Sequence, residues 1–247
     1  AGVTINDTKN KMQRVFRANA ELSGFPLSLI KDNAFLDSNL YRFLKLDAEL
    51  IRKLSFKKSA LVLRLFTGVG YEFNSTVNSK KKNNLPFFKE YFAGGPNSMR
   101  AWGLRKLGRG SSLRPFSGPG STPERYGDVQ LEGNIEYRFP LFKQAGIKVE
   151  GALFTDIGNI WFLKKGADTL GSKEIFNFSR LAKDLAVGVG MGLRLDFSFF
   201  VIRLDYSYKA KDPSPSPTNS SLQNKWFGYK LLKGDQFQLG ISYPFIL

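Results

Sequence analysis

Apolar and polar residues alternate along most of this chain of 247 residues, and the alternating stretches are long. From Val129 to Leu141 every second residue is apolar or glycine, while Gln130 to Arg138 place polar residues between them. A period of two indicates a β-strand with one apolar and one polar face. The same pattern recurs in residues 16–22, 44–50, 61–71, 147–161, 185–196, 200–208 and 237–245. The sequence therefore predicts an all-β, antiparallel protein of about eight strands.

The predicted strands and their connections are typical of a transmembrane β-barrel. Most strands reach the ~9–11 residues that cross a bilayer, and aromatic residues such as Trp161 and Tyr208 lie near their ends. Short connections alternate with long ones, as in barrels with turns on one side and loops on the other. The short connections are 55–59, 143–146 and 197–198, and the long ones are 24–39, 74–125, 162–183 and 209–234. A water-soluble barrel around an apolar ligand remains an alternative.

Composition narrows the chemistry that the chain could perform. It has no histidine and no cysteine, which excludes imidazole and thiolate catalysis and the usual zinc sites. We therefore expect no enzyme, no cofactor and no metal site. The net charge of +16 fits anionic lipid or nucleic acid, but the longest basic run, residues 80–82, lacks interleaved aromatics. We expect no nucleic-acid partner. The N-terminus lacks the apolar segment of a secretion signal, and no window approaches the ~20 apolar residues of a spanning helix.

The candidate site is a glycine-rich segment within the longest loop, and it carries one arginine. It reads Gly94-Gly95-Pro96-Asn97-Ser98-Met99-Arg100-Ala101-Trp102. Two acidic residues on the polar faces of later strands, Glu136 and Asp156, could receive Arg100, because a guanidinium fork can bind two carboxylates. The alternative is that Arg100 is solvated in the loop while Asp156 pairs with Lys148.

Three motifs in this order resemble the BamA/TamA family of outer-membrane assembly barrels. Met99-Arg100-Ala101-Trp102, after Gly94-Gly95, is similar to the family's loop motif Val-Arg-Gly-Phe or Val-Arg-Gly-Tyr. Ala101 and Trp102 depart from it in a way that resembles the TamA-like lipoprotein branch of Bacteroidota. Phe154, Asp156 and Gly158 match the strand motif Phe-x-Asp-x-Gly, and Glu136 matches an acidic strand position. Residues 235–240 resemble the final strand, with Gly240 where that strand kinks.

The resemblance implies a barrel of sixteen strands in which the arginine loop precedes the last five. Residues 1–247 would then be the C-terminal half of a transmembrane barrel, with a large extracellular loop at about 74–125 and no POTRA domain. The first predicted strand, near Gln13, would be an interior strand that lacks its neighbour. We therefore expect that strand and the one near Phe237 to need partners from a missing segment or another chain, so that the chain does not close a barrel alone.

The resemblance also implies a function, namely inserting nascent barrel proteins or moving polypeptide at the outer membrane of a Gram-negative bacterium. Arg100 would be tethered in the lumen to Glu136 and Asp156. The last strand, with Phe237, Gly240 and Phe245, would form a seam that opens sideways, although Gly240 fits plain barrel curvature equally. Expected partners are membrane lipid including lipopolysaccharide, nascent outer-membrane proteins, and the missing N-terminal half or accessory subunits.

Besides a water-soluble, lipid-binding barrel, two rival functions remain at this stage. The first is a passive porin-like channel, which charged residues on the polar faces would suit. Those residues are Arg138, Lys148, Glu150, Arg194, Arg203 and Asp205. The second is a barrel enzyme, such as a lipase or protease. Because there is no histidine, that enzyme would lack the usual general base.

Overall fold

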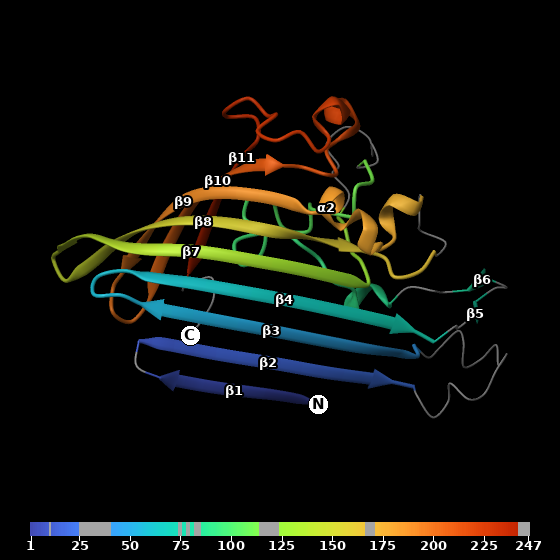
Figure 1. Cartoon of the computed structure of the whole chain (residues 1–247), viewed down its shortest axis with the longest axis horizontal. Helices are drawn as coiled ribbons and strands as arrows, with labels where there is room; N and C mark the ends of the chain where they lie inside the picture. Colours follow the sequence, from blue (N-terminus) through green and yellow to red (C-terminus); the bar gives the residue numbers. More distant parts are fainter. Residues whose placement is uncertain are drawn as a thin grey trace.

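The computed structural model describes residues 1–9, 11–24, 41–73, 76–77, 80–81, 85–113, 124–165 and 171–241. Nine antiparallel strands form one sheet in the order β1-β2-β3-β4-β7-β8-β9-β10-β11, so each strand lies beside its neighbours in sequence within that set (Figure 1). Their bounds are Gly2–Lys9, Met12–Ser23, Phe43–Ser55, Ala60–Glu72, Val129–Gln144, Ile147–Trp161, Ala186–Asp196, Val201–Lys211 and Asp235–Ile241. The fold is all-β and fits a partial barrel, as the alternation predicts.

Short elements lie in the connections between these strands. Strands β5 and β6 pair with each other outside the main sheet. The bounds are Thr76–Val77 for β5, Lys80–Lys81 for β6, Phe87–Lys89 for η2, Ser172–Glu174 for η3, Phe178–Arg180 for η4, Leu181–Asp184 for α2 and Pro217–Leu222 for η5. In the described ranges no helix has the length and apolar character needed to cross a membrane.

The first strand, β1, is the element that the sequence pattern missed. Only Val3 and Ile5 mark its apolar face before Asn6 and Asp7 interrupt the alternation, which is too short a signal. The structure pairs β1 with β2 along its whole length, with Ile5 opposite Phe16. The expectation that the strand near Gln13 lacks a neighbour in this chain was therefore wrong.

The sheet is open in the part of the chain that the structure describes. Strands β1 and β11 are its two outer members, and the described residues form no pairing between them. The nine described strands therefore do not close on themselves, and the expectation that the whole chain needs outside strands to close stays a prediction. An open edge carries backbone N–H and C=O groups that need partners.

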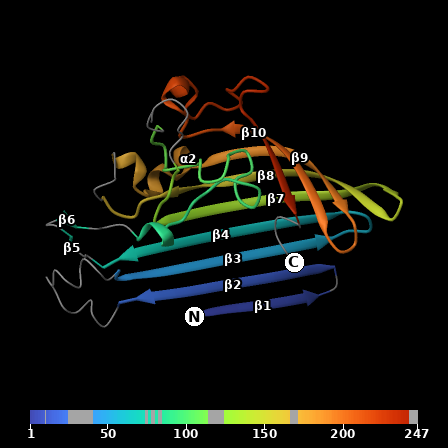
Figure 2. The ribbon, with the colours of Figure 1, turned by 180° about the vertical axis from the view of Figure 1, so that it is seen from behind.

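The two faces of the sheet differ in the way that the alternation predicts. We call the face that carries the arginine loop the inner face, and Figure 2 shows this loop, in green, lying across the sheet. Glu136, Asp156 and Asp205 are on the inner face and completely buried. On the outer face, Leu153 is 52% exposed and Leu239 is 62% exposed. Strands β7, β8 and β10 therefore present acidic residues on the side of the loop, and the strands carry apolar residues on the opposite side.

Turns and loops alternate between the two ends of the strands, as expected. At one end lie tight connections such as the β7–β8 hairpin, where Ala145 and Gly146 have φ of +50° and +84°. Two residues with positive φ match the twist that a two-residue hairpin needs. The connections around β4–β7, β8–β9 and β10–β11 are long and gather at the other end (Figure 1). Loops at this end of the strands can fold back onto the inner face of the sheet.

The alternation gives a first testable prediction, which concerns arginine on the two faces. In a bilayer, Leu153→Arg at the middle of the outer face of β8 should cost about 2–4 kcal/mol of the free energy of unfolding. Asn19→Arg, on the inner face of β2 and exposed, is the matched control and should cost far less. Urea unfolding in lipid vesicles measures both values. Equal losses for the two variants would contradict a lipid-facing outer surface.

Candidate functional site

The long loop between β4 and β7 folds back against the inner face and forms a small apolar core there. Two isolated backbone bridges hold its stem, Tyr91 to Gly127 and Ala93 to Leu107. The core joins buried loop residues to buried residues of the strands. Its members are Phe43, Leu85, Tyr91, Ala93, Met99, Ala101, Trp102, Leu107, Ile160 and Ala186. The loop is therefore packed as part of the structure.

Two glycines shape the tip of this loop. Gly94 and Gly95 have φ of +107° and +92°, a region that favours glycine. A Cβ on Gly94 would lie 2.2 Å from the carbonyl oxygen of Gly103. The Gly95 N–H donates to the Trp102 carbonyl at 2.8 Å, which closes the tip. The Gly-Gly pair is thus required by the backbone path that presents Arg100 to the strands.

Arg100 forms a fork-to-fork ion pair with Asp156 of β8. Its Nε lies 2.9 Å from Oδ2 and its Nη2 lies 2.8 Å from Oδ1 of that carboxylate. The Arg100 backbone N–H also donates to Oδ2 at 3.0 Å, and the Asn134 side chain donates to Oδ1 at 2.9 Å. Both Arg100 and Asp156 are completely buried. Asp156 therefore binds the guanidinium and the backbone of the loop tip together.

Glu136 of β7 accepts the remaining side of the guanidinium, from Nη1 of Arg100. Its other oxygen accepts from Nε of Arg138 at 2.8 Å and lies 3.2 Å from Nη2 of Arg194. Arg194 in turn donates to Asp205 of β10, whose Oδ2 lies 3.9 Å from Nη1 of Arg100. The two carboxylates that the sequence analysis named therefore both contact Arg100, within a larger buried network of charges.

The three residues of the Phe-x-Asp-x-Gly motif share the inner face of β8, and each has a separate contact. The ring of Phe154 stacks on the guanidinium, with Cζ of Arg100 3.4 Å from the ring centroid. Asp156 binds the same guanidinium. A Cβ on Gly158 would lie 2.5 Å from the Leu131 carbonyl oxygen and 3.0 Å from Cγ of Glu132. Gly158 thus leaves the room that Glu132 needs to reach Ser98 of the loop.

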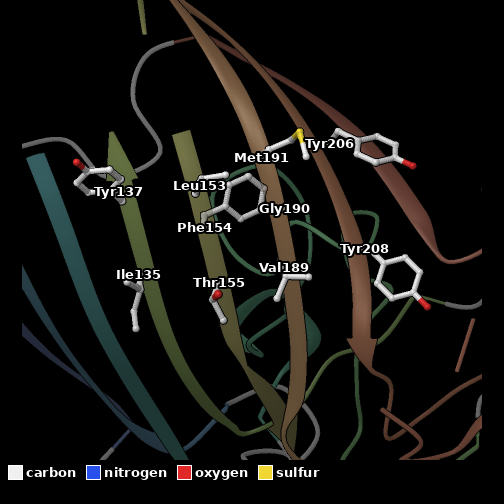
Figure 3. Close-up of a pocket in the computed structure, with 10 residues that line it drawn as sticks. All are labelled: Ile135, Tyr137, Leu153, Phe154, Thr155, Val189, Gly190, Met191, Tyr206 and Tyr208. Carbon is white, nitrogen blue, oxygen red and sulfur yellow. The ribbon is translucent and has the colours of Figure 1, made fainter. Parts of the chain in front are cut away.

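Phe154 also fills the wall between the inner and the outer face. Its ring lies where Gly190 has no side chain, so that a Cβ there would approach the ring to 2.4 Å. On the outer face the same wall borders a shallow apolar groove of about 400 Å³. Figure 3 shows the groove across β7 to β10, lined by Ile135, Tyr137, Leu153, Phe154, Thr155, Val189, Gly190, Met191, Tyr206 and Tyr208. Phe154 thus contacts Arg100 on the inner face and also lines this groove.

Burial sets the electrostatics of the loop. Burial alone lowers the pKa of Arg100, but the attraction and hydrogen bonds of Asp156, with Glu136, outweigh it and raise the pKa above its ordinary value. The pKa of Tyr91 is raised by burial and by its hydrogen bond to Asp47. Burial raises the pKa of Asp128 to about 6, although the N–H groups of Leu85 and Leu163 bind its carboxylate and oppose that shift. Because its pKa is raised, Arg100 stays charged at any physiological pH.

The two residues that depart from the family's loop motif are both buried. Ala101 lies over Gly188 of β9, where a Cβ on the glycine would be 2.8 Å from the Ala101 methyl group. Trp102 belongs to the loop core and its ring also lies near Gly188. The missing side chain at position 188 therefore makes room for the methyl group that this chain carries at position 101.

The last strand contributes to the same side of the structure. Gly240 lies on the inner face opposite Arg203, and a Cβ there would lie 2.6 Å from Nη2 of that arginine. Arg203 donates to the carbonyl oxygen of Pro96 and to the side chain of Asn97. Phe237 is on the outer face and exposed. Phe245 lies outside the described residues.

Several contacts of the loop were missed by sequence reasoning. Ser98, Glu132, Asn134 and Arg203 all bind the loop tip or the residues that hold it. The strand residues among them share the inner-face parity of Glu136, which is the signal that could have identified them. The alternative pairing of Asp156 with Lys148 was wrong, because the Lys148 ammonium lies 3.9 Å from Asp196.

Comparison with known proteins places this geometry in a family context. Residues 22–245 match the model of the Omp85 superfamily domain, which covers most of the sheet and the whole arginine loop. A search of curated proteins gives no match to the chain.

Removing the guanidinium should release the loop. In Arg100→Ala, two buried carboxylates lose their partner, and breaking a buried pair in this way costs about 3–5 kcal/mol. Arg105→Ala is the control in the same loop, because its bond to Glu124 joins side chains that are 37% and 48% exposed. An exposed pair of this kind contributes about 0–1 kcal/mol. Urea unfolding and trypsin cleavage at Lys106 measure the two effects, and equal sensitivity of both variants would contradict the buried tether.

The contact between Ala101 and Gly188 can be tested with a double-mutant cycle. Gly188→Ala should displace the loop tip, because the two methyl groups would lie 2.8 Å apart. Overpacking of a core costs about 1–3 kcal/mol. Ala101→Gly should restore most of that loss in the double variant, as coupled neighbours do. Additive losses in trypsin protection of the loop would show that the two residues do not pack together.

Proposed function

This chain belongs to the Omp85 superfamily, and we propose that it inserts nascent β-barrel proteins into an outer membrane or moves polypeptide through it. Membership in this superfamily supports outer-membrane protein insertion or translocation and disfavours an enzyme or a passive channel. The proposal for this chain adds a tethered arginine loop and a seam at the last strand. It needs no covalent chemistry and no cofactor.

The observation that carries the proposal is the buried ion pair of Arg100 with Asp156 and Glu136. A passive channel requires open space along the inner face, whereas here the loop tip occupies that face and binds β7 and β8. The charges that would have suited a porin are largely committed to this network. Arg138, Arg194, Arg203 and Asp205 all contact Glu136 or each other. Their arrangement supports a socket for the loop.

The proposed seam is β11. It is an outer member of the described sheet, paired with β10 on one side only among the described residues. A free strand edge can accept a client strand by β-augmentation. In lipid, unpaired backbone groups cost several kcal/mol each, which favours pairing with an incoming strand. Phe237 and Gly240 belong to this strand, and Phe245 would extend it.

The remaining parts of the proposal concern setting and partners. Five strands, β7 to β11, follow the arginine loop, the number that the resemblance implies. Residues 1–247 would be the C-terminal part of a barrel whose other strands come from the missing N-terminal half or from accessory subunits. The protein would lie in the outer membrane of a Gram-negative bacterium, in contact with lipid including lipopolysaccharide. Nascent outer-membrane proteins would be its clients.

A cross-linking experiment tests the seam. The chain has no cysteine, so a single engineered cysteine is unique. A cysteine at Leu239 on β11 should cross-link to a cysteine in the strand of a nascent client during insertion. The matched cysteine at Leu204, opposite Leu239 on β10, should not, because β10 is paired on both sides. Equal cross-linking from both positions, or from neither, would contradict a seam at β11.

A further inference from the structure

Gln238 joins the last strand to the loop tip. Its side-chain Nε2 lies 3.3 Å from the carbonyl oxygen of Arg100 and 3.2 Å from that of Trp102. A glutamine amide has two N–H donors, so it can serve both carbonyls at once. Gln236 is on the same face two residues earlier, but its amide reaches the carbonyl of Phe237 on its own strand, at 3.2 Å. The contact with the loop is therefore specific to one of two similar glutamines.

Strand β10 strengthens this connection at two points beside Gln238. The Ser207 hydroxyl lies 2.8 Å from the Arg100 carbonyl oxygen and 3.1 Å from that of Gln236. Arg203 donates to the Pro96 carbonyl at 2.7 Å while its guanidinium lies over Gly240. Polar groups of β10 and β11 thus converge on the backbone of the loop tip.

The loop consequently bridges the inner face from one part of the sheet to another. The Arg100 side chain is bound to β7 and β8, while its carbonyl oxygen is bound to β10 and β11. Strand β11 is short and has one neighbour among the described strands, along seven residue pairs. A few further hydrogen bonds therefore add substantially to the pairing that attaches β11 to β10.

We propose that Gln238 is a positioning residue that fastens the last strand to the arginine loop, so that release of the loop and loosening of β11 are one event. The inference rests on the proposed function only in taking β11 as the seam. When Arg100 leaves Asp156 and Glu136, the two carbonyl acceptors leave Gln238 with it. When Gln238 loses its donors, the loop tip loses its attachment to the last strand.

Hydrogen exchange of backbone amides in the intact protein, held in lipid nanodiscs, tests the coupling. Gln238→Ala should speed exchange of the backbone amides in residues 235–241 about five- to tenfold, which is the effect expected from the net contribution of the lost hydrogen bonds. It should also speed exchange in residues 94–102 of the loop. Gln236→Ala is the matched control and should leave the loop unchanged. Gln238→Glu keeps the shape but removes both donors, so it should behave like the alanine variant.

The reciprocal measurement starts from the other end of the loop. Arg100→Ala should speed exchange in β11, although the carboxylates that bind the Arg100 side chain belong to β7 and β8. Asp156→Asn is the second variant should Arg100→Ala fail to fold, because it keeps the shape of the partner and removes its charge. Unchanged exchange in β11 when the tether is weakened, or in the loop for Gln238→Ala, would overturn the proposal.

Client insertion is a separate readout and separates the two proposals. If exchange in the loop and in β11 rises together while insertion stays normal, the coupling stands and the proposed role of the seam fails. If insertion falls in Gln238→Ala but exchange in the loop is the same as in Gln236→Ala, the coupling fails and the seam stands.

Discussion

The bidentate ion pair between Arg100 and Asp156 is the contact on which the arrangement of the inner face depends. Both side chains are completely buried, and charges leave water at a high cost unless their partners are well placed. The neighbouring residues supply those partners. Asn134 fills a remaining acceptor of Asp156, Glu136 takes the rest of the guanidinium, and Phe154 covers its face. A buried pair of this kind contributes less to stability than to specificity, because the loop has one position in which every charge is matched.

Glycines on the inner face make that position accessible. A loop tip can approach a sheet closely where side chains are absent, as Ala101 does over Gly188. Gly158 and Gly240 leave room instead for Glu132 and Arg203, whose side chains bind the loop tip. On the outer face the same strands carry large apolar residues, so the sheet is bulky on one side and thin on the other. The inner face of β9 reads Ala-x-Gly-x-Gly-x-Gly, in which Gly188 lies against Ala101 of the loop, while Gly190 and Gly192 leave room for the strand residues Phe154 and Asp205. The pattern belongs to the surface that receives the loop as much as to the curvature of a barrel.

The sequence predicted the strands of the sheet and the partners of Arg100, because a period of two is a local signal that assigns each residue to a face. Parity places Glu136 and Asp156 on the polar faces, together with Glu132 and Glu150, and the family resemblance singled out the first two. Strand β1 was missed because its alternation ends after Ile5. Parity places Arg203 and Gln238 on the inner face, but which atoms of the loop they bind could not be predicted, because that depends on the path of a loop shaped by two glycines with positive φ. From the sequence alone, charged inner-face residues such as Arg194 and Asp205 could line a channel or bind the loop, and only the path of the loop distinguishes the two.

The two outer strands of the described sheet differ in how they are held. Every residue of β1 is exposed, and β1 is attached through its pairing with β2. Strand β11 alternates between half-buried and exposed residues because the loop tip covers its inner face. A strand that is held partly by a tether can be loosened by moving the tether, whereas the rest of the sheet keeps its hydrogen bonds. The physical difference between the edges therefore originates in the arginine loop, which is fixed by buried charges at one end and by neutral hydrogen bonds to the last strand at the other. Since charge-assisted hydrogen bonds are stronger than neutral ones, the ion pairs of Arg100 set the position of the loop tip, and the hydrogen bonds to the last strand depend on that position.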